Sequence, residues 1–369
     1  MRNDVVELFA NISNINKQEI RKIYAEQKHE GMKPFVEKTI DIVRTELLNE
    51  NIVFPPIWYK DKIDVSSRKE RHIGIQNIKQ QIYDYIAVEG LKPLLKRIGN
   101  HQYASIKTRG QIAGVKQVQR WLRNKNIKYF AKLDVYKCYP NINHIKLLNF
   151  LRKHIKNNKL LWLIEELLAS FKTGLSIGSY LSQFLCNLYL SLVYHFIGNQ
   201  HHLRKRKNGH SELIPLVHHR LLYMDDIFIM GTSSKNIHKA VRLIIEYCKS
   251  LGLTIKENWF VRKMVFDRSD NFSFIDIMGF KIYRNFITIR KRVFKRIRHI
   301  YMKVYKLWKT HQKILICFAR KCISYNGLLK NSNSFKVMKK YHVDDVLRIC
   351  KKVVKNNNES KVFYRTATC

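Results

Sequence analysis

Two adjacent aspartates, Asp225 and Asp226, divide a hydrophobic stretch at residues 217–231 into two short apolar segments. Two such segments separated by a few residues predict a tight β-hairpin, with the acids at its tip. A third acid, Asp134, lies at the end of another apolar segment, residues 128–135, which predicts a further strand. Carboxylates at the ends of buried strands are costly unless they serve a function. The pattern therefore indicates a sheet that gathers three acids.

Carboxylates brought close together repel one another, and a divalent cation relieves that repulsion. A pair of such cations about 4 Å apart can activate a hydroxyl and stabilise a leaving group. An ordinary Asp-Asp pair is a solvated turn, which is how we interpret Asp344 and Asp345. For Asp225 and Asp226, the apolar flanks and the strand acid Asp134 favour a site for Mg²⁺ or Mn²⁺.

The charge of the chain points to a polyanionic partner. Lys and Arg number 69 against 28 Asp and Glu, a formal excess of 41 positive charges in 369 residues. Nucleic acid is the first expectation and an anionic membrane surface the second. The apolar content of 46% excludes wholesale disorder, and the length suits about two domains.

Nothing in the sequence predicts export or a membrane span. Residues 173–202 contain no Asp, Glu, Lys or Arg, but polar residues interrupt them. The uniformly apolar part is shorter than the roughly 20 residues that a bilayer requires, so we expect a buried helix after a glycine-rich loop. The seven cysteines are scattered and form no Cys-x-x-Cys pair. We expect a cytoplasmic protein without a signal peptide or a disulfide framework.

Hydrophobic periodicity predicts alternating helices and strands along the chain. Helices are expected within residues 1–60 up to a break at 51–60, and at residues 76–98, 111–123, 144–170, 236–251 and from 290 onward. Strands are expected at residues 128–135, 217–222, 227–231 and 276–289, a charged hairpin at 65–75, and an exposed basic loop at 204–209.

Three segments in this order resemble the palm motifs of reverse transcriptases. They are residues 131–140 (Ala-Lys-Leu-Asp-Val-Tyr-Lys-Cys-Tyr-Pro), 174–183 (Gly-Leu-Ser-Ile-Gly-Ser-Tyr-Leu-Ser-Gln) and 223–226 (Tyr-Met-Asp-Asp), which match motifs A, B and C. Residues 251–256 and 278–283 resemble motif D and the primer grip, and residues 69–73 resemble the fingers hairpin. The resemblance covers about residues 65 to 330 and is nearest the bacterial, group II intron-like branch.

The resemblance implies an α+β right-hand polymerase fold with fingers, a palm of antiparallel sheet plus helices, and a helical thumb. The expected divisions are an N-terminal helical extension at residues 1–60, fingers at 61–128, the palm at 129–289, and a basic helical thumb with a tail at 290–369.

The resemblance also implies a role for each acid of the candidate site. Asp134 and Asp225 would be metal ligands, and Asp226 a third, more peripheral acid. The backbone of Val135 would lie beside the metals and the triphosphate. Lys256 matches the motif D lysine that is proposed as general acid to the pyrophosphate.

Further residues would bind the incoming nucleotide. Lys69 and Arg71 would hold its phosphates, although a solvated basic hairpin is the alternative for both. Tyr139 matches the aromatic residue that blocks a ribose 2′-hydroxyl, and its alternative is packing beneath the turn at Pro140. The floor under the nucleotide would be formed by Gly178 and Gln183.

Basic residues outside the palm are candidates for contacts with the template and the primer. Lys107 and Arg109, in the segment Lys-Thr-Arg-Gly, are candidates for contact with the template backbone, and the absence of any such contact is the equal alternative. Residues 290–313 carry apolar positions on one helical face and basic residues elsewhere, which suits a thumb helix that grips a duplex through phosphates. Its candidate contacts are Arg292, Lys295, Arg296 and Arg298.

The expected function is RNA-directed DNA synthesis on a structured non-coding RNA, from a DNA or RNA primer and with dNTPs. The segment after the primer grip accommodates a thumb but not a maturase domain plus endonuclease. Two kinds of stand-alone bacterial enzyme remain, anti-phage defence reverse transcriptases and those of diversity-generating retroelements. Residues 178–183, Gly-Ser-Tyr-Leu-Ser-Gln, favour defence. A homo-oligomer or an accessory protein is compatible with either.

One alternative from another class stays open, a catalytically idle RNA-binding scaffold. It accounts for the charge but leaves Asp134, Asp225 and Asp226 without a purpose.

Overall fold

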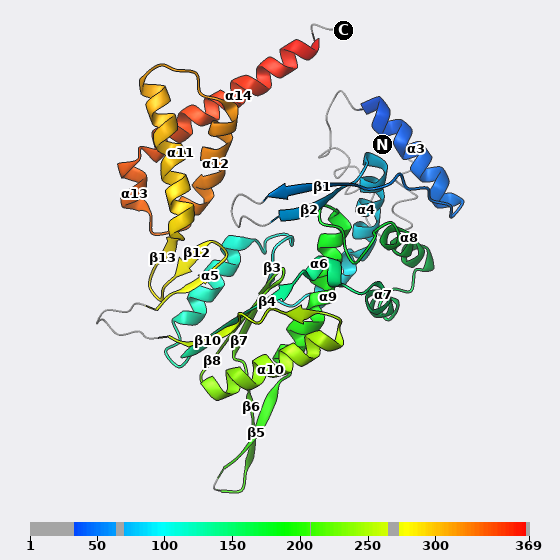
Figure 1. Ribbon diagram of the computed structural model, residues 1–369, viewed down its shortest axis with the longest axis vertical. Coiled ribbons are helices and arrows are strands. Elements are labelled where there is room, and N and C mark those ends of the chain that lie inside the picture. Colours follow the sequence, from blue (N-terminus) through cyan, green and yellow to red (C-terminus); the bar gives the residue numbers. More distant parts are fainter. Residues whose placement is uncertain (1–32, 64–69, 207, 265–272, 367–369) are drawn as a thin grey trace. The chain divides into compact units, whose positions relative to one another are not determined.

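The computed structural model describes residues 33–63, 70–206, 208–264 and 273–366 (Figure 1). The chain divides into two compact units. The first unit comprises residues 1–107 and 129–262, and the second comprises residues 108–128 and 263–369. Part of the expected N-terminal helical segment, residues 1–32, lies outside the described part of the chain. Helix α3, Lys33–Leu48, contains the expected apolar positions Ile40, Val43 and Leu47.

A six-stranded sheet forms the centre of the first unit. Its strand order is β10-β4-β8-β7-β3, with β9 also paired to β4. The β4/β8, β4/β9 and β7/β8 pairs are antiparallel, and the short pair β3/β7 is parallel. The strands are β3 (Gln102–Tyr103), β4 (Tyr129–Tyr136), β7 (His219–Tyr223), β8 (Asp226–Gly231), β9 (Thr254–Ile255) and β10 (Phe260–Lys263).

Helices pack on this sheet and around it. Helix α9, Tyr180–Gly198, contacts β7 and helix α4, Ile78–Leu91. Helix α10, Ser234–Ser250, contacts β4 and β8. Because most side chains of α9 are buried, the buried helix expected in residues 173–202 is confirmed. The first unit also contains the short helices η2 (Lys92–Arg97) and α6 (Cys138–Asn141) and the helices α7 (His144–Arg152) and α8 (Asn158–Ala169).

Local sequence signals set where several helices begin. A side-chain oxygen at the N-cap accepts a hydrogen bond from the backbone N–H three residues later, which satisfies a donor that the helix itself leaves unpaired. The residues that cap in this way are Asn77, Asn143, Asn157, Ser179 and Ser233.

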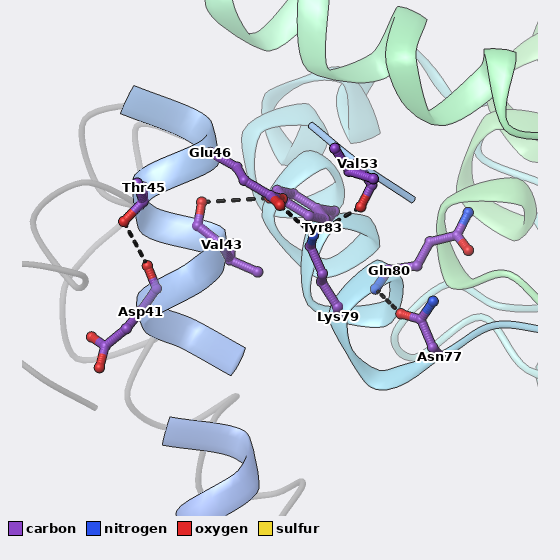
Figure 2. A network of polar contacts seen from close by, with 9 residues as sticks. All are labelled: Asp41, Val43, Thr45, Glu46, Val53, Asn77, Lys79, Gln80 and Tyr83. Carbon is purple, nitrogen blue, oxygen red and sulfur yellow. Dashed lines mark hydrogen bonds and ion pairs between the residues drawn. The ribbon is translucent and has the colours of Figure 1, made fainter. Parts of the chain in front are cut away.

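A polar network joins α3 to α4 (Figure 2). The Tyr83 hydroxyl donates to Glu46 Oε2 at 2.6 Å, and burial raises the pKa of this tyrosine. Lys79 Nζ pairs with the other oxygen of Glu46 and donates to the Val53 carbonyl at 2.8 Å. Helix α3 is therefore joined to α4 by a charged pair as well as by apolar packing.

Two hairpins extend from the first unit (Figure 1). The fingers hairpin pairs β1, Trp58–Ile63, with β2, Glu70–Ile75. Its first strand begins earlier than the expected start at residue 65, and residues 64–69 lie outside the described part of the chain. The second hairpin pairs β5, His201–Lys205, with β6, Ser211–Pro215. The exposed loop expected at residues 204–209 is thus partly strand.

The second unit combines a three-stranded antiparallel sheet with helices. Helix α5, Gln111–Leu122, contacts β12 and receives a hydrogen bond from Arg284 Nε to the Leu122 carbonyl at 2.9 Å. The other elements are β11 (Ile275–Ile277), β12 (Phe280–Ile282), β13 (Ile287–Ile289), α11 (Lys291–Lys309), α12 (Ile316–Lys330), α13 (Phe335–Lys340) and α14 (Val343–Thr366).

The expected α+β class is confirmed, with a mainly antiparallel sheet and helices in the first unit and a helical C-terminal part in the second. The expected boundaries of fingers, palm and thumb stay a prediction. Across the described ranges, no helix is both long and apolar enough to cross a membrane.

Candidate active site

Strand register brings the three candidate acids to one end of the central sheet. Asp134 on β4 lies opposite Asp226 on β8, and Tyr223 on β7 also pairs with Asp226. Asp225 lies in the turn between β7 and β8, and its carbonyl accepts a hydrogen bond from the Val135 N–H at 3.0 Å. The hairpin that the sequence predicts around these acids is therefore present, and its turn is bonded to β4.

The turn has a special backbone conformation at Met224, whose φ is +52°. Left-handed backbone costs a residue with a Cβ roughly 1–2 kcal/mol. The side chain of Met224 lies against Tyr139, whose hydroxyl is 4.0 Å from the Met224 sulfur. The packing around the turn holds this conformation in place.

Burial and neighbouring acids raise the pKa of both Asp225 and Asp226. Burial raises the pKa of Asp226, and Asp225 and Asp134 add to this rise, while Lys132 opposes it. The Lys132 ammonium is 3.4 Å from Asp226 Oδ1. Asp225 is exposed at the turn, yet the atoms packed around it withdraw enough water to raise its pKa. Asp134 raises the pKa of Asp225 further.

Two cationic side chains approach the acids from other elements. Lys256 follows β9, its N–H donates to the Asp134 carbonyl at 2.9 Å, and its ammonium pairs with Asp134 Oδ1. Arg71 is an exposed residue of β2. Both Lys256 and Arg71 lower the pKa of Asp225, so the fingers hairpin places a guanidinium within electrostatic reach of the turn.

Among the residues that the structure describes, no three His, Cys, Asp or Glu side chains are close enough together to hold a metal ion. The donor set nevertheless fits Mg²⁺ or Mn²⁺ in its chemistry, because Asp134 and Asp225 offer the hard oxygen ligands that these ions prefer. Asp134 raises the pKa of Asp225, which indicates repulsion between the two carboxylates. A divalent cation would relieve this repulsion.

Tyr139 lies beside the acidic turn. It belongs to the short helix α6, its ring is half-buried, and burial raises the pKa of its hydroxyl. Its carbonyl accepts a hydrogen bond from the Leu175 N–H at 2.8 Å. A Cβ added at Gly174, where φ is +50°, would lie 2.4 Å from that same carbonyl oxygen. Glycine at this position therefore allows the motif B loop to lie directly against α6.

The motif B loop also contacts the fingers hairpin. Gly178 has a φ of +120°, and a Cβ there would lie 2.3 Å from the carbonyl oxygen of Gly74. The Gly74 N–H donates to the Ile177 carbonyl at 2.7 Å. Gln183 is half-buried in the first turns of α9, and its carbonyl accepts from Asn187 Nδ2 at 3.2 Å.

Other candidate residues lie elsewhere. Lys69 is outside the described residues. Lys107 is exposed at the end of the first unit, and Arg109 is half-buried in the second. Three of the four thumb candidates on α11 are exposed, while the fourth is partly buried. The exposed residues are Arg292, Lys295 and Arg298, and the partly buried one is Arg296.

The sequence interpretation missed two residues near these motifs. Lys132, two positions before Asp134 on β4, pairs with Asp226. Asp84 is fully buried in α4 and receives a hydrogen bond from Ser179 of motif B. A signal for each was present, since each is a charged residue within an apolar segment.

Three solved telomerase structures resemble this chain distantly. The structure of apo telomerase from Candida tropicalis, truncated from its C-terminal domain, has 13% identity and a TM-score of 0.43 over 64% of this chain and 54% of that one. Telomerase from Candida tropicalis in complex with the TWJ fragment of telomeric RNA has 13% identity and a TM-score of 0.46, over 87% and 57%. The corresponding complex from Candida albicans has 12% identity and a TM-score of 0.41, over 80% and 60%.

This chain thus spans less than two thirds of the length of each telomerase chain. No curated protein matches its sequence. The model of the family described as "Reverse transcriptase (RNA-dependent DNA polymerase)" matches residues 60–274, which is more than half of the chain and includes most of the fingers hairpin and all three acids. This protein belongs to the reverse transcriptase family.

Proposed function

We propose that this protein is an RNA-directed DNA polymerase that synthesises cDNA by nucleotidyl transfer with two divalent metal ions. The observation that carries the proposal is the register of β4 and β8, which places Asp134 opposite Asp226 with Asp225 in the adjoining turn. Membership of the reverse transcriptase family supports the same activity.

The acids would form the metal site. Asp134 and Asp225, together with the backbone carbonyl of Val135, would hold Mg²⁺ or Mn²⁺, and Asp226 would contribute negative charge from β8. When bound, these ions would activate the primer 3′-hydroxyl and neutralise charge on the leaving pyrophosphate. The hydrogen bond from the Val135 N–H to the Asp225 carbonyl would hold the acidic turn against β4 during turnover.

The nucleotide would lie between the acids and the fingers hairpin. Arg71 would hold its triphosphate, since a guanidinium offers two parallel hydrogen bonds to phosphate, and Lys69 would add a point charge. Tyr139 would face the sugar, because its ring already lies against the acidic turn. Gly178 and Gln183 would shape the floor beneath the base.

Lys256 would act at the leaving group. Its ammonium lies against Asp134, so it is positioned beside the metal ligands and can donate a proton to the departing pyrophosphate. Lys107, Arg109 and the basic face of α11 would contribute phosphate contacts, which give affinity for template and primer without sequence choice.

The biological role we favour is anti-phage defence, with a dedicated non-coding RNA as the template. The support is the motif B sequence at residues 178–183. A role in a diversity-generating retroelement is the alternative. Sequencing the nucleic acid that copurifies with the protein separates the two, because cDNA copied from a repeat of a neighbouring protein gene would indicate diversity generation.

The activity is tested by primer extension on an RNA template with dNTPs and Mg²⁺ or Mn²⁺. We expect Asp225→Asn to lower extension by at least about 10³-fold, since a lost metal ligand removes most of the charge stabilisation. Asp344→Asn changes an exposed acid of the chain's other Asp-Asp pair and serves as the matched control. RNA binding should survive in both variants.

An idle scaffold gives a different outcome. In that case the wild-type protein would bind RNA but extend no primer under any of these conditions, and Asp225→Asn would change neither property.

A further inference from the structure

A carboxylate that the proposed catalytic steps do not use is buried beneath motif B. Asp84 lies in the middle of α4, and none of its surface is exposed to solvent. An ionised carboxylate is expensive to bury unless it is well hydrogen-bonded. Its contacts therefore indicate what this residue does.

One oxygen of Asp84 is hydrogen-bonded to the beginning of α9. The hydroxyl of Ser179, the N-cap of that helix, donates to Asp84 Oδ2 at 2.6 Å, and the Leu181 N–H donates to the same oxygen at 3.3 Å. Ser179 Oγ in turn accepts from the Ser182 N–H at 3.1 Å. Asp84 thus caps α9 from another helix, at the end where the helix dipole favours negative charge.

The other oxygen of Asp84 is less well satisfied. Asp84 Oδ1 is buried and accepts no hydrogen bond of normal geometry within the part of the chain that the structure describes, although the Gln76 side chain lies near enough to lower the pKa of Asp84. A residue kept only for packing would avoid the cost of this unsatisfied acceptor. The hydrogen bonds from Asp84 to α9 therefore offer the physical reason for a carboxylate at this position.

A second contact holds the motif B loop on the other side of Gly178. The Gly74 N–H donates to the Ile177 carbonyl at 2.7 Å, and Gly178 itself lies against the Gly74 carbonyl. Gly74 and Asp84 are ten residues apart in one continuous segment, β2 followed by α4. That segment therefore holds the loop on both sides of Gly178.

We propose that Asp84 is a positioning residue that holds the Gly178 loop and the first turns of α9 in the geometry that binds the incoming deoxynucleoside triphosphate. This inference rests on the proposed polymerase function. Asp84 acts through Ser179 and Leu181 and does not itself touch the nucleotide. Its removal should weaken nucleotide binding while the metal-binding acids on β4 and β8 stay in place.

The experiment compares Asp84→Ala with Asp84→Asn in steady-state extension at saturating template–primer, with rates normalised to active enzyme. For Asp84→Ala we expect KM for dNTP to rise about tenfold, the effect of losing one hydrogen bond to a charged group, with kcat changed less than about twofold. Asp84→Asn keeps an acceptor oxygen for Ser179 and Leu181. Its KM should return to within about threefold of the wild-type value.

Gln80→Ala is the matched control. Gln80 lies one turn earlier on α4, is equally buried, and donates from Nε2 to Ser170 Oγ at 2.8 Å, at the end of α8 and not at the start of α9. A loss of stability alone would therefore appear in Gln80→Ala as well. We expect this variant to lower the melting temperature and leave KM unchanged.

If Asp84→Ala does not fold, Ser179 carries the same test. Ser179→Ala removes the hydroxyl that bonds Asp84 and should raise KM for dNTP, whereas Ser179→Asn supplies another capping side chain and should restore it. Wild-type extension with an unchanged KM in Asp84→Ala, or in Ser179→Ala, would overturn the positioning role alone. A wild-type protein that extends no primer would overturn the proposed function, and the positioning role with it.

Discussion

The ammonium group of Lys256 pairs with the carboxylate of Asp134, and the backbone N–H of Lys256 donates to the Asp134 carbonyl at 2.9 Å. Strand β9 fixes this arrangement, because Ile255 pairs with Val135 next to both residues. Lys256 therefore approaches the acids from the residue after a short strand. Its backbone N–H and its side-chain ammonium each contact Asp134.

We expect Lys256→Ala to lower the rate of nucleotide addition by about 100-fold, the usual contribution of a general acid. Lys256→Arg keeps the charge but transfers a proton poorly, so its rate should lie much nearer that of the alanine variant than that of the wild type. Single-turnover incorporation of one dNTP measures this, with exposed Lys249→Ala as the control. A wild-type rate in Lys256→Ala would remove Lys256 from the chemistry.

Sugar selection should depend on Tyr139. An aromatic ring where a 2′-hydroxyl must fit discriminates by a steric clash. We therefore expect Tyr139→Ala to raise the ratio of rNTP to dNTP catalytic efficiency by about tenfold or more, with a modest loss for dNTP. Tyr139→Phe loses only the hydroxyl contact to Met224 and should keep the wild-type ratio.

The assay for this prediction is single-nucleotide extension with matched rNTP and dNTP. An unchanged ratio in folded Tyr139→Ala would show that the ring packs beneath the turn and does not face the sugar. Loss of both activities together would lead to the same conclusion.

The basic face of α11 should give RNA binding a steep dependence on salt. Replacing exposed Arg292, Lys295 and Arg298 with alanine should weaken binding and lower the slope of log affinity against log salt by about one for each lost phosphate contact.

A matched control for this prediction is available on α10. Lys235, Lys239 and Arg242 are also exposed at helical spacing, so their replacement removes the same charge from another helix. Fluorescence anisotropy with labelled RNA over a salt series gives both slopes. Equal slopes for the two triple variants would mean that the salt dependence of RNA binding comes from the overall positive charge of the protein and not from α11 in particular.

The buried Asp84 should make stability depend on pH. Burial raises its pKa to about 6 in the folded protein, against opposing hydrogen bonds from Ser179 and Leu181. A raised carboxyl pKa means that ionisation opposes folding, so the cost is absent below about pH 4, grows as the pH approaches 6, and is complete above it.

Asp84→Asn cannot ionise and escapes this cost. Relative to the wild type, its free energy of unfolding should therefore increase by about 2 kcal/mol between about pH 4.5 and pH 7.5, out of the roughly 3 kcal/mol that a full shift of about two pKa units represents. Urea unfolding at several pH values measures the difference, and any fixed effect of the amide cancels between them. A pH-independent difference would mean that Asp84 titrates normally.

The placement of the acids could be predicted from the sequence because it depends on local pattern. Apolar segments that flank Asp225 and Asp226 are long enough to form strands, and a hairpin between them leaves its turn residues at the end of the sheet. The buried character of α9 was predictable for the same reason, since charged residues are absent from residues 173–202.

Contacts between distant segments could not be predicted in this way. The bond from Ser179 to Asp84 joins residues 95 positions apart, and neither residue carries a local sign of the other. The first fingers strand, β1, was missed because it follows Pro55 and Pro56 and has five exposed or charged positions among its six, which resemble an irregular segment.

The path of the chain between the two units limits how the protein can be divided. Helix α5 precedes the strand that carries Asp134, yet its buried residues Val115, Val118 and Trp121 pack within the unit that resumes at residue 263. A fragment ending at residue 262 would therefore keep α5 and lose β12, the strand it contacts, which exposes an apolar helix face to aggregation. A fragment that retains the first unit alone would instead need residues 108–128 replaced by a short polar linker, so that both halves of the second unit are removed together.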